Sequence, residues 1–401
     1  MKSFDIVISG GGLVGAALAI GLARIGFKVA VIEATSRSAD SQPSYDDRTL
    51  VVNAASLNIL SNLGLLPNEL DRQPLRRIQI TRAGGFGHLE LDAADHGRDY
   101  FGAVIVAREL GNVMLAALAS EDNITELCPA SLETFTVDDD RIEVRLASGE
   151  KLAARLLIGA DGNHSRVRDI AGLACQRHDY QQSAMIFNIT PGHAPAATAW
   201  ERFTPDGPLA LLPQPAGRLG VVWIAATEGI DEAMSWTDEQ LVERLLKRFG
   251  PSLGSFSRPG KRARYPLVRQ RTSRPISERI VVVGNAANAV HPVSAQGFNL
   301  GLRDVAGLID ALTKAKDPGD DTLLENYAQA RKDDQEATVA YTDTLARAFT
   351  NPLPLAGLAA SLGLAAHAGW PSLTRRLVRS AMGFREPVST LARDPADHSR
   401  P

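Results

Sequence analysis

The sequence has few cysteines and no excess of charge of either sign. Its 401 residues include only Cys128 and Cys175, too few for a disulfide framework or a four-ligand zinc site, and this scarcity fits a reducing cytosol. The 43 lysines and arginines nearly balance 46 aspartates and glutamates, which gives a net charge of −3. A protein that binds nucleic acid needs a basic surface to neutralise phosphates. We therefore expect a cytoplasmic protein with no nucleic-acid partner.

Signals for metal binding and for export are also missing. The eight histidines do not show a metal-ligand spacing such as H-E-x-x-H, so no metal site is predicted. Residues 4–30 are largely apolar, as in a signal peptide, but they contain Gly10, Gly11, Gly12 and Gly15 in a strand-turn-helix pattern. Apolar residues make up 44% and charged residues 22% of the chain. This balance is typical of a globular protein, and the length favours two joined domains.

The first 33 residues show the pattern of a βαβ unit. Residues 4–9 predict a buried strand, residues 16–25 a helix that Gly26 ends, and residues 28–33 a second strand. Between the first strand and the helix, three glycines fill the motif G-x-G-x-x-G. The first permits a tight turn, the second lets a pyrophosphate approach the backbone, and the third lets helix and strand pack closely. We predict that the loop binds a dinucleotide through Gly10, Gly12, Leu13, Val14 and Gly15.

An acidic residue closes the second strand of this unit. Glu33 lies 21 residues after Gly12 (33 − 12). A carboxylate there can accept both hydroxyls of an unphosphorylated ribose and would repel a 2′-phosphate. The unit therefore predicts FAD or NAD rather than NADP at this site, without separating FAD from NAD. A glycine turn with no ligand is the alternative interpretation.

The middle of the chain is typical of a sheet-rich insertion, which makes it a candidate substrate domain. A hairpin is expected over residues 141–159, with its turn at Ser148 and Gly149. Further strands are expected at residues 184–190, 199–203 and 219–226.

The last part of the chain is richer in helix. Thr237 opens a helix with a capping-box pattern that ends at Gln240. Residues 280–284 predict a strand followed by small residues that start a helix, and the chain is expected to be mainly helical from about residue 322.

Two later segments decide between the ligands. One is residues 159–168, and the other is residues 284–301. Together with the glycine loop they resemble the flavoprotein monooxygenases that act on aromatic rings and have a single dinucleotide-binding domain. Within that class the chain resembles the ubiquinone-biosynthesis hydroxylases, most of all the 2-polyprenyl-6-methoxyphenol hydroxylases. The resemblance covers nearly the whole chain. It includes less specific middle segments at residues 201–204, 207–213, 260–262 and 265–267, on which the choice of subfamily rests.

The resemblance implies a fold and a division into domains. The fold is α/β (α+β overall), with a Rossmann-like FAD-binding domain, an inserted mixed β-sheet substrate domain and C-terminal helices, as in p-hydroxybenzoate hydroxylase-type monooxygenases. The FAD-binding domain is expected to comprise residues 1–72, 103–180 and 270–340. The substrate domain is expected to comprise residues 73–102 and 181–269, and residues 341–401 a C-terminal helical region.

The resemblance also assigns cofactor contacts. The glycine loop and Glu33 hold the ADP portion, Arg48 lies near the phosphates, and Arg108 is a second contact. The remaining contacts are Asp161 and Gly162, Gly284 and Asn285 near the ribityl phosphate, and Pro292, Gly297, Phe298, Asn299 and Leu300 beside the isoalloxazine ring. From the residues alone, Arg48 is also typical of a surface ion pair, Arg108 of a helix end, and Asp-Gly of an ordinary turn.

The sequence departs from the class pattern at two positions. Asn285 stands where the pattern has aspartate, and Ala295 where glycine is common. An amide oxygen still accepts a hydroxyl hydrogen bond, so we expect FAD binding to survive both changes.

The implied reaction is the hydroxylation of a phenol. NAD(P)H reduces bound FAD, dioxygen adds to give a hydroperoxide at the flavin C4a carbon, and the phenol ring takes up its distal oxygen. The chain contains no second nucleotide-binding unit, so NAD(P)H is expected to bind transiently. No catalytic base is assigned. Tyr180, Tyr265 and His291 are candidates, and His291 is also typical of a structural histidine.

Other interpretations stay open. They are a related hydroxylase for a soluble phenol, a flavin-binding scaffold in a quinone-biosynthesis complex, and an NAD-dependent dehydrogenase. Residues 353–370 are apolar and are followed by Arg375, Arg376 and Arg379. They favour either a helix packed on the protein or an amphipathic segment at a membrane surface. Peripheral contact with the inner membrane and with other ubiquinone-biosynthesis proteins would suit a polyprenylated substrate.

Overall fold

A mostly parallel sheet forms one half of the molecule. The computed structural model describes residues 1–37, 48–85, 88–193, 197–350, 361–363, 366–367 and 370–394. In the parallel sheet only the edge strand β20 runs antiparallel to its neighbour. The strand order is β20 (Ile276–Ser277), β21 (Ile280–Val282), β13 (Leu156–Gly159), β2 (Ile6–Ser9), β3 (Val29–Ile32) and β9 (Ile124–Leu127).

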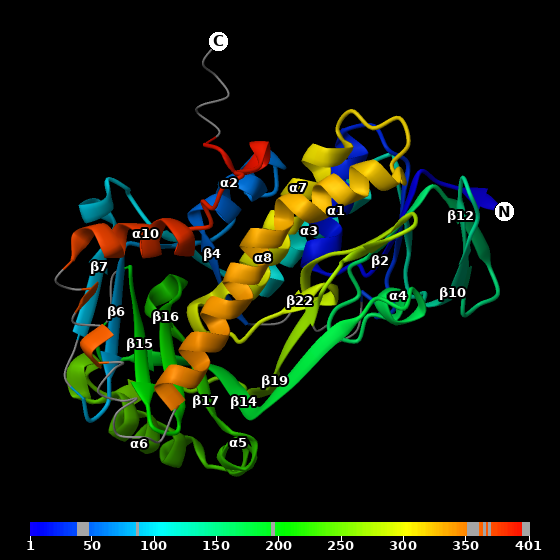
Figure 1. Cartoon of the computed structure of the whole chain (residues 1–401). Coiled ribbons are helices and arrows are strands. Elements are labelled where there is room, and N and C mark those ends of the chain that lie inside the picture. The colour runs from blue at the N-terminus through cyan, green and yellow to red at the C-terminus, as the bar shows by residue number, and fades with distance from the viewer. Residues whose placement is uncertain are drawn as a thin grey trace.

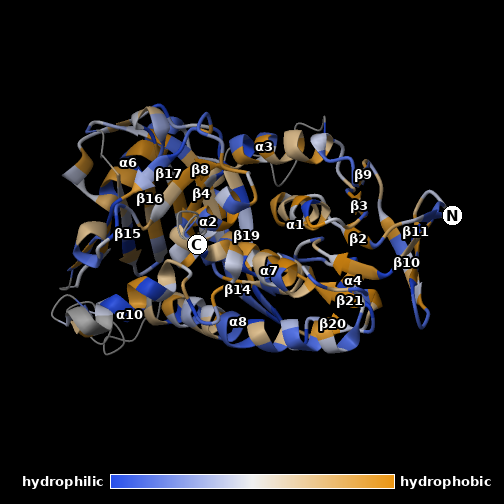
Figure 2. Cartoon of the chain, turned by 90° about the horizontal axis from the view of Figure 1, so that it is seen from above, coloured by the Kyte–Doolittle hydropathy of each residue, from blue (hydrophilic) through white to orange (hydrophobic). Residues whose placement is uncertain are grey.

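The helix α1 (Leu13–Arg24) packs into the core beside this sheet. It lies between α3 (Ala107–Ser120) and α7 (Gln296–Leu312), as Figure 2 shows. A Cβ atom at Gly21 would come within 2.3 Å of the Ile309 side chain of α7. The small residues of α1 therefore let two helices approach closely. Gly26, with φ +99°, ends the helix region, which confirms the predicted βαβ unit.

A long, mostly antiparallel sheet forms the other half (Figure 1). Its strand order is β22 (Asn288–Ala289), β19 (Ala263–Thr272), β14 (Cys175–Pro191), β17 (Leu219–Ala226), β16 (Gly207–Pro213), β15 (Thr198–Thr204), β6 (Arg77–Arg82) and β7 (His88–Asp92). The short β18 (Phe256–Ser257) pairs with β14. β14 and β19 run across the boundaries predicted near residues 180 and 270, so the division into domains stays a prediction.

Smaller elements complete the fold. Two further sheets have the orders β1 (Lys2–Ser3), β12 (Lys151–Ala154), β11 (Ile142–Leu146), β10 (Leu132–Val137), and β4 (Thr49–Asn53), β8 (Gly102–Val106), β5 (Gln73–Leu75). The other helices are α2 (Ala54–Asn62), α4 (Arg166–Ile170), α5 (Thr227–Met234), α6 (Asp238–Phe249), α8 (Asp321–Thr350) and α10 (Pro371–Ala381). Short 3-10 turns are η1 (Ala93–His96), η2 (Pro215–Gly217), η3 (Pro251–Leu253), η4 (Gly284–Ala286), η5 (Val293–Ala295) and η6 (Thr390–Ala392).

Two local predictions were wrong. The strand expected over residues 151–159 is two strands, because the chain leaves β12 in one sheet and enters β13 in the parallel sheet. The helix expected directly after residue 284 is only the turn η4, and α7 begins at Gln296. The capping box of α6 at Thr237 and Gln240 is confirmed.

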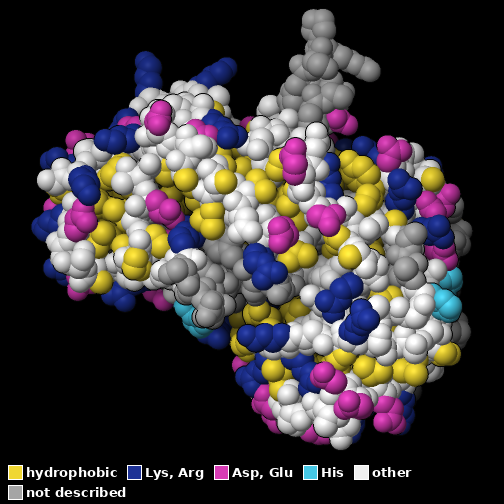
Figure 3. All heavy atoms as spheres, turned by 180° about the vertical axis from the view of Figure 1, so that it is seen from behind, with side chains coloured by type: hydrophobic (Ala, Val, Ile, Leu, Met, Phe, Trp, Pro, Cys, Tyr) yellow, Lys and Arg dark blue, Asp and Glu magenta, His cyan; other side chains and the backbone are white. Residues whose placement is uncertain are grey.

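A buried charge cluster joins α7 to α8. Arg303 Nε lies 2.7 Å from Asp334 Oδ2, and Arg331 Nη2 lies 2.8 Å from the same atom. Asp304 Oδ1 lies 3.0 Å from Arg331 Nη2. Figure 3 shows a different distribution outside, where side chains of both charge signs are interspersed over the visible face. The inner charges are thus paired with one another and fix one helix against the other.

Candidate active site

The glycine loop is shaped by two close backbone approaches. Gly10 has φ +107°, and a Cβ atom there would lie 2.4 Å from the carbonyl oxygen of Ala160. At Gly15 a Cβ atom would lie 1.9 Å from the carbonyl oxygen of Gly10. Only glycine fits such positions. Gly12 caps α1 without a side-chain hydrogen bond, and no acidic residue lies in the first turn, so the helix end offers N–H groups and partial positive charge to an anion.

Glu33 lies directly after β3, beside this loop. Its Oε2 accepts a hydrogen bond of 2.8 Å from the Gly11 amide, and its Oε1 accepts one of 2.8 Å from the Thr35 amide. Each carboxylate oxygen has a further lone pair. The side chain is therefore held in place and can still accept hydrogen bonds from hydroxyl groups.

The Asp161-Gly162 turn follows β13, the strand next to β2. Asp161 Oδ2 accepts hydrogen bonds from the amides of Arg166 (2.8 Å) and Val167 (3.2 Å). Asp161 Oδ1 and Asn163 Oδ1 are buried and have no hydrogen-bond partner within the described ranges. Leaving a buried oxygen unpaired costs about 1–3 kcal/mol. These two oxygens are thus suited to receive hydrogen bonds from a polar ligand.

The third motif reaches the same place. Gly284 has φ +58°, and a Cβ atom there would lie 3.1 Å from Val14 Cγ1. At Gly301 of α7 a Cβ atom would lie 2.9 Å from Val14 Cγ2. These approaches bring η4 and the start of α7 against the start of α1. Asn285, exposed at the edge of η4, lines the cavity that the three motifs border.

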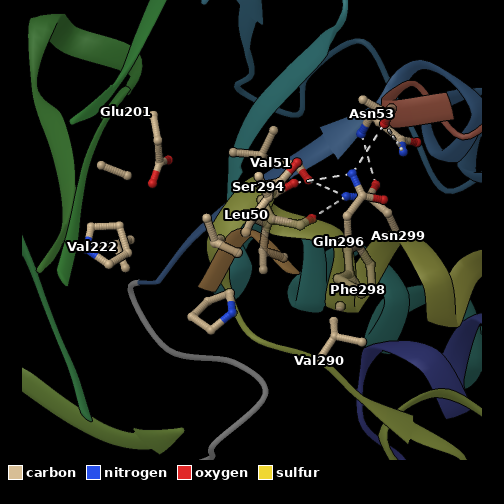
Figure 4. A pocket seen from close by; sticks show the side chains of 18 of the residues that line it. Leu50, Val51, Asn53, Glu201, Val222, Val290, Ser294, Gln296, Phe298 and Asn299 are labelled. Carbon is tan, nitrogen blue, oxygen red and sulfur yellow. Dashed lines mark hydrogen bonds between the residues drawn. The ribbon is translucent and has the colours of Figure 1, made fainter. Parts of the chain in front are cut away.

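The loop before α7 has a constrained backbone. Ser294 and Ala295 have φ values of +66° and +50°, a left-handed conformation that costs a non-glycine residue about 1–2 kcal/mol. Asn299 holds this loop in place: its Nδ2 donates to the carbonyl of Ala295 at 2.7 Å and to that of Val51 at 2.8 Å. Its Oδ1 accepts from the Asn53 amide at 2.9 Å (Figure 4). Ala295, where the sequence departs from the glycine common in the class, therefore has a backbone conformation that favours glycine.

A cavity of about 880 Å³ extends from these motifs to the long sheet. Its walls are mainly apolar and come from the sheet and from the helices α8 and α10. On the sheet side they include Ile78, Ile80, Leu89, Leu91, Ala199, Phe203, Leu212, Val222 and Ile224. On the helix side they include Leu345, Ala348, Leu377, Val378, Ala381 and Met382. A cavity of this volume and character is typical of a small-molecule site.

Glu201 is a carboxylate within these apolar walls. It projects from β15 into the pocket, across from Leu50 and Ser294 in Figure 4. Burial raises its pKa to about 7. Reasoning from the sequence did not single it out, although an acid between Ala199 and Phe203 in an alternating strand pattern is an available signal.

Comparison with known sequences assigns the family. A sequence family described as an FAD binding domain matches residues 3–342. The chain belongs to this family. Ubiquinone hydroxylase UbiL of Rhodospirillum rubrum is 34% identical over 389 residues, covering 95% of this chain and 90% of the relative. The 3-demethoxyubiquinol 3-hydroxylase of Escherichia coli is 34% identical over 389 residues, covering 95% and 98%. The chain is thus an FAD-dependent hydroxylase, as its motifs predicted.

Solved structures confirm the predicted fold. The p-nitrophenol 4-monooxygenase PnpA of Pseudomonas putida has a TM-score of 0.79 and 18% identity, covering 96% of this chain and 100% of that one. HpxO of Klebsiella pneumoniae, complexed with FAD and uric acid, has a TM-score of 0.73 and 17% identity, covering 96% of each chain. The hydroxylase therefore has the α/β architecture of FAD-dependent monooxygenases.

The predicted cofactor residues fall into two groups in this hydroxylase. One group lines the cavity: Gly12, Leu13, Val14, Arg48, Gly162, Asn285, Pro292, Gly297, Phe298 and Asn299. The other lies outside that lining: Gly10, Gly15, Glu33, Arg108, Asp161, Gly284 and Leu300. Leu300 is buried within α7, and Gly10, Gly15 and Gly284 shape the backbone behind the lining.

The two predicted arginines occupy adjacent segments. The Arg48 carbonyl accepts a hydrogen bond of 2.9 Å from the amide of Ala107, the first residue of α3. The Arg48 guanidinium lies 5.1 Å from the ring centre of Tyr265, which also lines the cavity. Arg108 is exposed, with its Nε 3.9 Å from Glu109 Oε1. Arg48 and Tyr265 are therefore placed to meet a ligand in the cavity directly.

His291 and Tyr180 lie together outside the cavity lining. His291 is 1% exposed, its Nδ1 accepts a hydrogen bond of 3.2 Å from the Val293 amide, and burial lowers its pKa to about 4. The Tyr180 ring stands edge-on to it at 5.0 Å, and the Tyr180 hydroxyl donates to Asp343 Oδ1 at 2.8 Å. His291 is thus held by packing and a backbone hydrogen bond, as is typical of a histidine with a structural role.

The C-terminal region is described only in part. Most of the apolar stretch over residues 353–370 lies outside the described residues. Among the helices that are described, none is both long and apolar enough to cross a membrane.

Proposed function

We propose that this hydroxylase oxidises the aromatic ring of a polyprenylated phenol in ubiquinone biosynthesis, with NAD(P)H and dioxygen as co-substrates. The substrate expected from the sequence is 2-polyprenyl-6-methoxyphenol. The observation that carries the proposal is the apolar cavity that connects the FAD motifs to α8 and α10. A phenol ring with a long hydrocarbon tail is a ligand that such walls would bury favourably. The names of the two relatives support the same pathway.

The residues present fit FAD. The glycine loop has no side chains to keep a pyrophosphate away from its backbone, and the N-terminus of α1 offers that pyrophosphate N–H groups and partial positive charge. The Glu33 carboxylate can still accept hydrogen bonds from ribose hydroxyls. The unpaired Oδ1 of Asp161 and the amide of Asn285 would take further hydroxyls of the cofactor. Bound FAD would supply the redox chemistry, with electrons from NAD(P)H and oxygen from dioxygen.

The chain itself supplies position, shielding and polarity. Apolar side chains such as Phe203 and Val222 exclude water from the space beside the ring. Gly297 and Phe298, in the first turn of α7, line the cavity. Such a helix end stabilises developing negative charge. The strained Ser294-Ala295 backbone fixes the direction of that turn.

We also propose peripheral contact with the membrane at the C-terminal region. Trp370 is 66% exposed, and α10 carries exposed arginines at positions 375, 376 and 379. Aromatic and basic side chains together suit an anionic lipid surface. Cosedimentation with anionic and with neutral vesicles tests this contact. Equal binding to both, or none, would contradict it.

The experiment that tests the proposed function has two parts. Purified protein should be yellow and release FAD on acid treatment. Deleting the gene should cause a prenylated phenol that lacks one hydroxyl group to accumulate, and its mass spectrum identifies the ring position. A colourless preparation that cannot be reconstituted, or an unchanged quinone profile, would contradict the proposal.

A further inference from the structure

Glu201 occupies a rigid position in the cavity wall. It lies on β15, which pairs with β16 on one side and β6 on the other. Ala199 and Phe203, two residues away in each direction, line the same cavity, because side chains alternate between the faces of a strand. Both neighbours are apolar. The carboxylate therefore stands alone on its part of the wall, on a backbone held from both sides.

The environment of Glu201 does not supply a cation. It makes no hydrogen bond or ion pair with the residues that the structure describes. The other titratable side chains that line the cavity are Arg48 just before β4, Tyr265 from β19, Tyr341 from α8, and His367. The rise of the Glu201 pKa has burial as its cause, with no compensating cation. A half-buried carboxylate in apolar walls, without a paired cation, is unfavourable unless a ligand or a function requires it.

The opposite wall holds the loop that precedes α7. Tyr341 is hydrogen-bonded to Ser294 of that loop, and the charge of Glu201 acts on the Tyr341 hydroxyl. Glu201 and Ser294 therefore border one space from two sides, as Figure 4 shows. The residues proposed to lie beside the isoalloxazine ring, Pro292 and Gly297, flank Ser294. A phenol ring in this space would lie between Glu201 and the flavin loop.

We infer that Glu201 is a catalytic residue whose carboxylate accepts the phenolic proton of the substrate. The inference rests on the proposed function and adds to it the missing base. The evidence is the placement of one uncompensated carboxylate in an apolar cavity, across from the flavin loop. Of the three candidates from sequence, His291 and Tyr180 lie outside the cavity lining, and Tyr265 lines the cavity with its ring beside the Arg48 guanidinium.

The proton balance closes over one turnover. The phenol O–H bond breaks as a Glu201 carboxylate oxygen gains the proton, and the oxygen lone pair raises the electron density of the ring. The ring carbon would then bond to one oxygen atom of dioxygen as the O–O bond breaks. The second oxygen atom would leave as water after taking a proton from solvent, with both electrons supplied by NAD(P)H through FAD. The ring carbon loses its hydrogen as a proton to solvent, and Glu201 returns its proton to the original phenol oxygen. The carboxylate ends as it began.

The first test compares ligand binding to the oxidised holoenzyme. The probes are a methoxyphenol with one isoprene unit and its O-methyl ether, which lacks the phenolic proton. Flavin absorbance changes report both dissociation constants. Above the pKa of about 7, the wild type should prefer the phenol by about 10-fold, because a hydrogen bond to a charged group is worth about 1.5–3 kcal/mol. The preference should fall below that pH. In E201Q it should be smaller and independent of pH, because an amide oxygen still accepts a hydroxyl hydrogen bond but does not titrate.

The second test measures turnover. E201Q should hydroxylate the phenol about 100-fold more slowly, within the usual range for a lost general base, while it still binds FAD and oxidises NAD(P)H. E201D, which keeps a carboxylate, should recover part of the rate. The matched control is E243Q, which removes an exposed carboxylate on α6 and should behave as wild type.

The outcomes separate the two proposals. If wild type yields no hydroxylated phenol, the proposed function fails. If wild type hydroxylates and E201Q matches its rate and pH profile, the inference about Glu201 fails while the function stands. If E201Q loses FAD or unfolds, an E201D variant that keeps FAD but shows neither phenol preference nor rate recovery would also overturn the inference.

Discussion

Neutralising Asp304 should destabilise the fold and loosen the FAD loop together. Its side chain is fully buried in α7. Its Oδ1 accepts hydrogen bonds from Arg331 Nε at 3.0 Å and from Gln335 Nε2 at 2.9 Å, both on α8. Its Oδ2 accepts one of 3.3 Å from the Gly284 amide. One carboxylate therefore joins α8, α7 and the turn η4.

The size of the expected loss in the free energy of unfolding follows from the charge cluster. The core of the cluster holds two arginines, 303 and 331, and two aspartates, 304 and 334. Although burial alone would raise the pKa of Asp334, Arg303 and Arg331 lower it to about 2, so it stays charged. Asp304→Asn leaves two cations against one anion. Removing one partner of a buried pair costs about 3–5 kcal/mol, a large part of a total stability of about 5–15 kcal/mol.

The assay is urea unfolding of the apoprotein, with FAD affinity measured by flavin fluorescence. D333N is the matched control, because Asp333 is exposed on α8, the helix that Asp304 contacts, and it should change stability by less than about 0.5 kcal/mol. Replacing both Asp304 and Arg331 by leucine should recover most of the loss, since apolar pairs substitute for buried ion pairs. If D304N costs no more than about 1 kcal/mol, as an exposed pair would, the reasoning is refuted.

Three further outcomes are expected. Gly15→Ala should abolish FAD retention, because its Cβ would lie 1.9 Å from the Gly10 carbonyl oxygen, whereas Gly229→Ala, with open space around the Cβ, should retain FAD; a yellow G15A protein would contradict this. Val378→Trp should fill the α10 side of the cavity and raise the KM for a long-prenyl substrate but not for a one-isoprene analogue; an equal rise for both would count against tail binding there. Because burial raises the pKa of Glu201 from 4.5 to about 7, wild-type stability relative to E201Q should fall as the pH rises through this interval, by up to about 3 kcal/mol. A pH-independent difference in urea midpoints would argue against that shift.

The FAD motifs could be predicted because their physical requirements are local. The turn at Gly10, the close packing at Gly15 and the acid at Glu33 all lie within one βαβ unit. Each requirement restricts the residue type at a fixed spacing, so the sequence alone displays it. The same holds for the capping box of α6, which depends on residues three positions apart.

The split of residues 151–159 and the charge cluster could not be predicted in this way. The hairpin pattern is identical whether the second strand continues in one sheet or passes to another after Ala154. Arg331 and Asp334 show only helical i,i+3 spacing, which is equally typical of an exposed pair. They are buried because α7 packs against them and supplies Arg303 and Asp304 as ion-pair partners. That packing brings together residues far apart in the sequence.

The order of strands explains why the cofactor site was visible in the sequence and the proposed base was not. β21, β13, β2 and β3 are neighbours in the parallel sheet, and Gly284, Asp161, Gly10 and Glu33 follow their carboxyl ends. Parallel strands bring these ends to one edge, so recognising each motif is enough to assemble the site. Glu201 comes from a different sheet, and which face it occupies depends on pairing with β6, more than a hundred residues earlier. Substitutions on β15 and α10 should therefore alter substrate choice while FAD binding is retained, because neither element contributes to that edge.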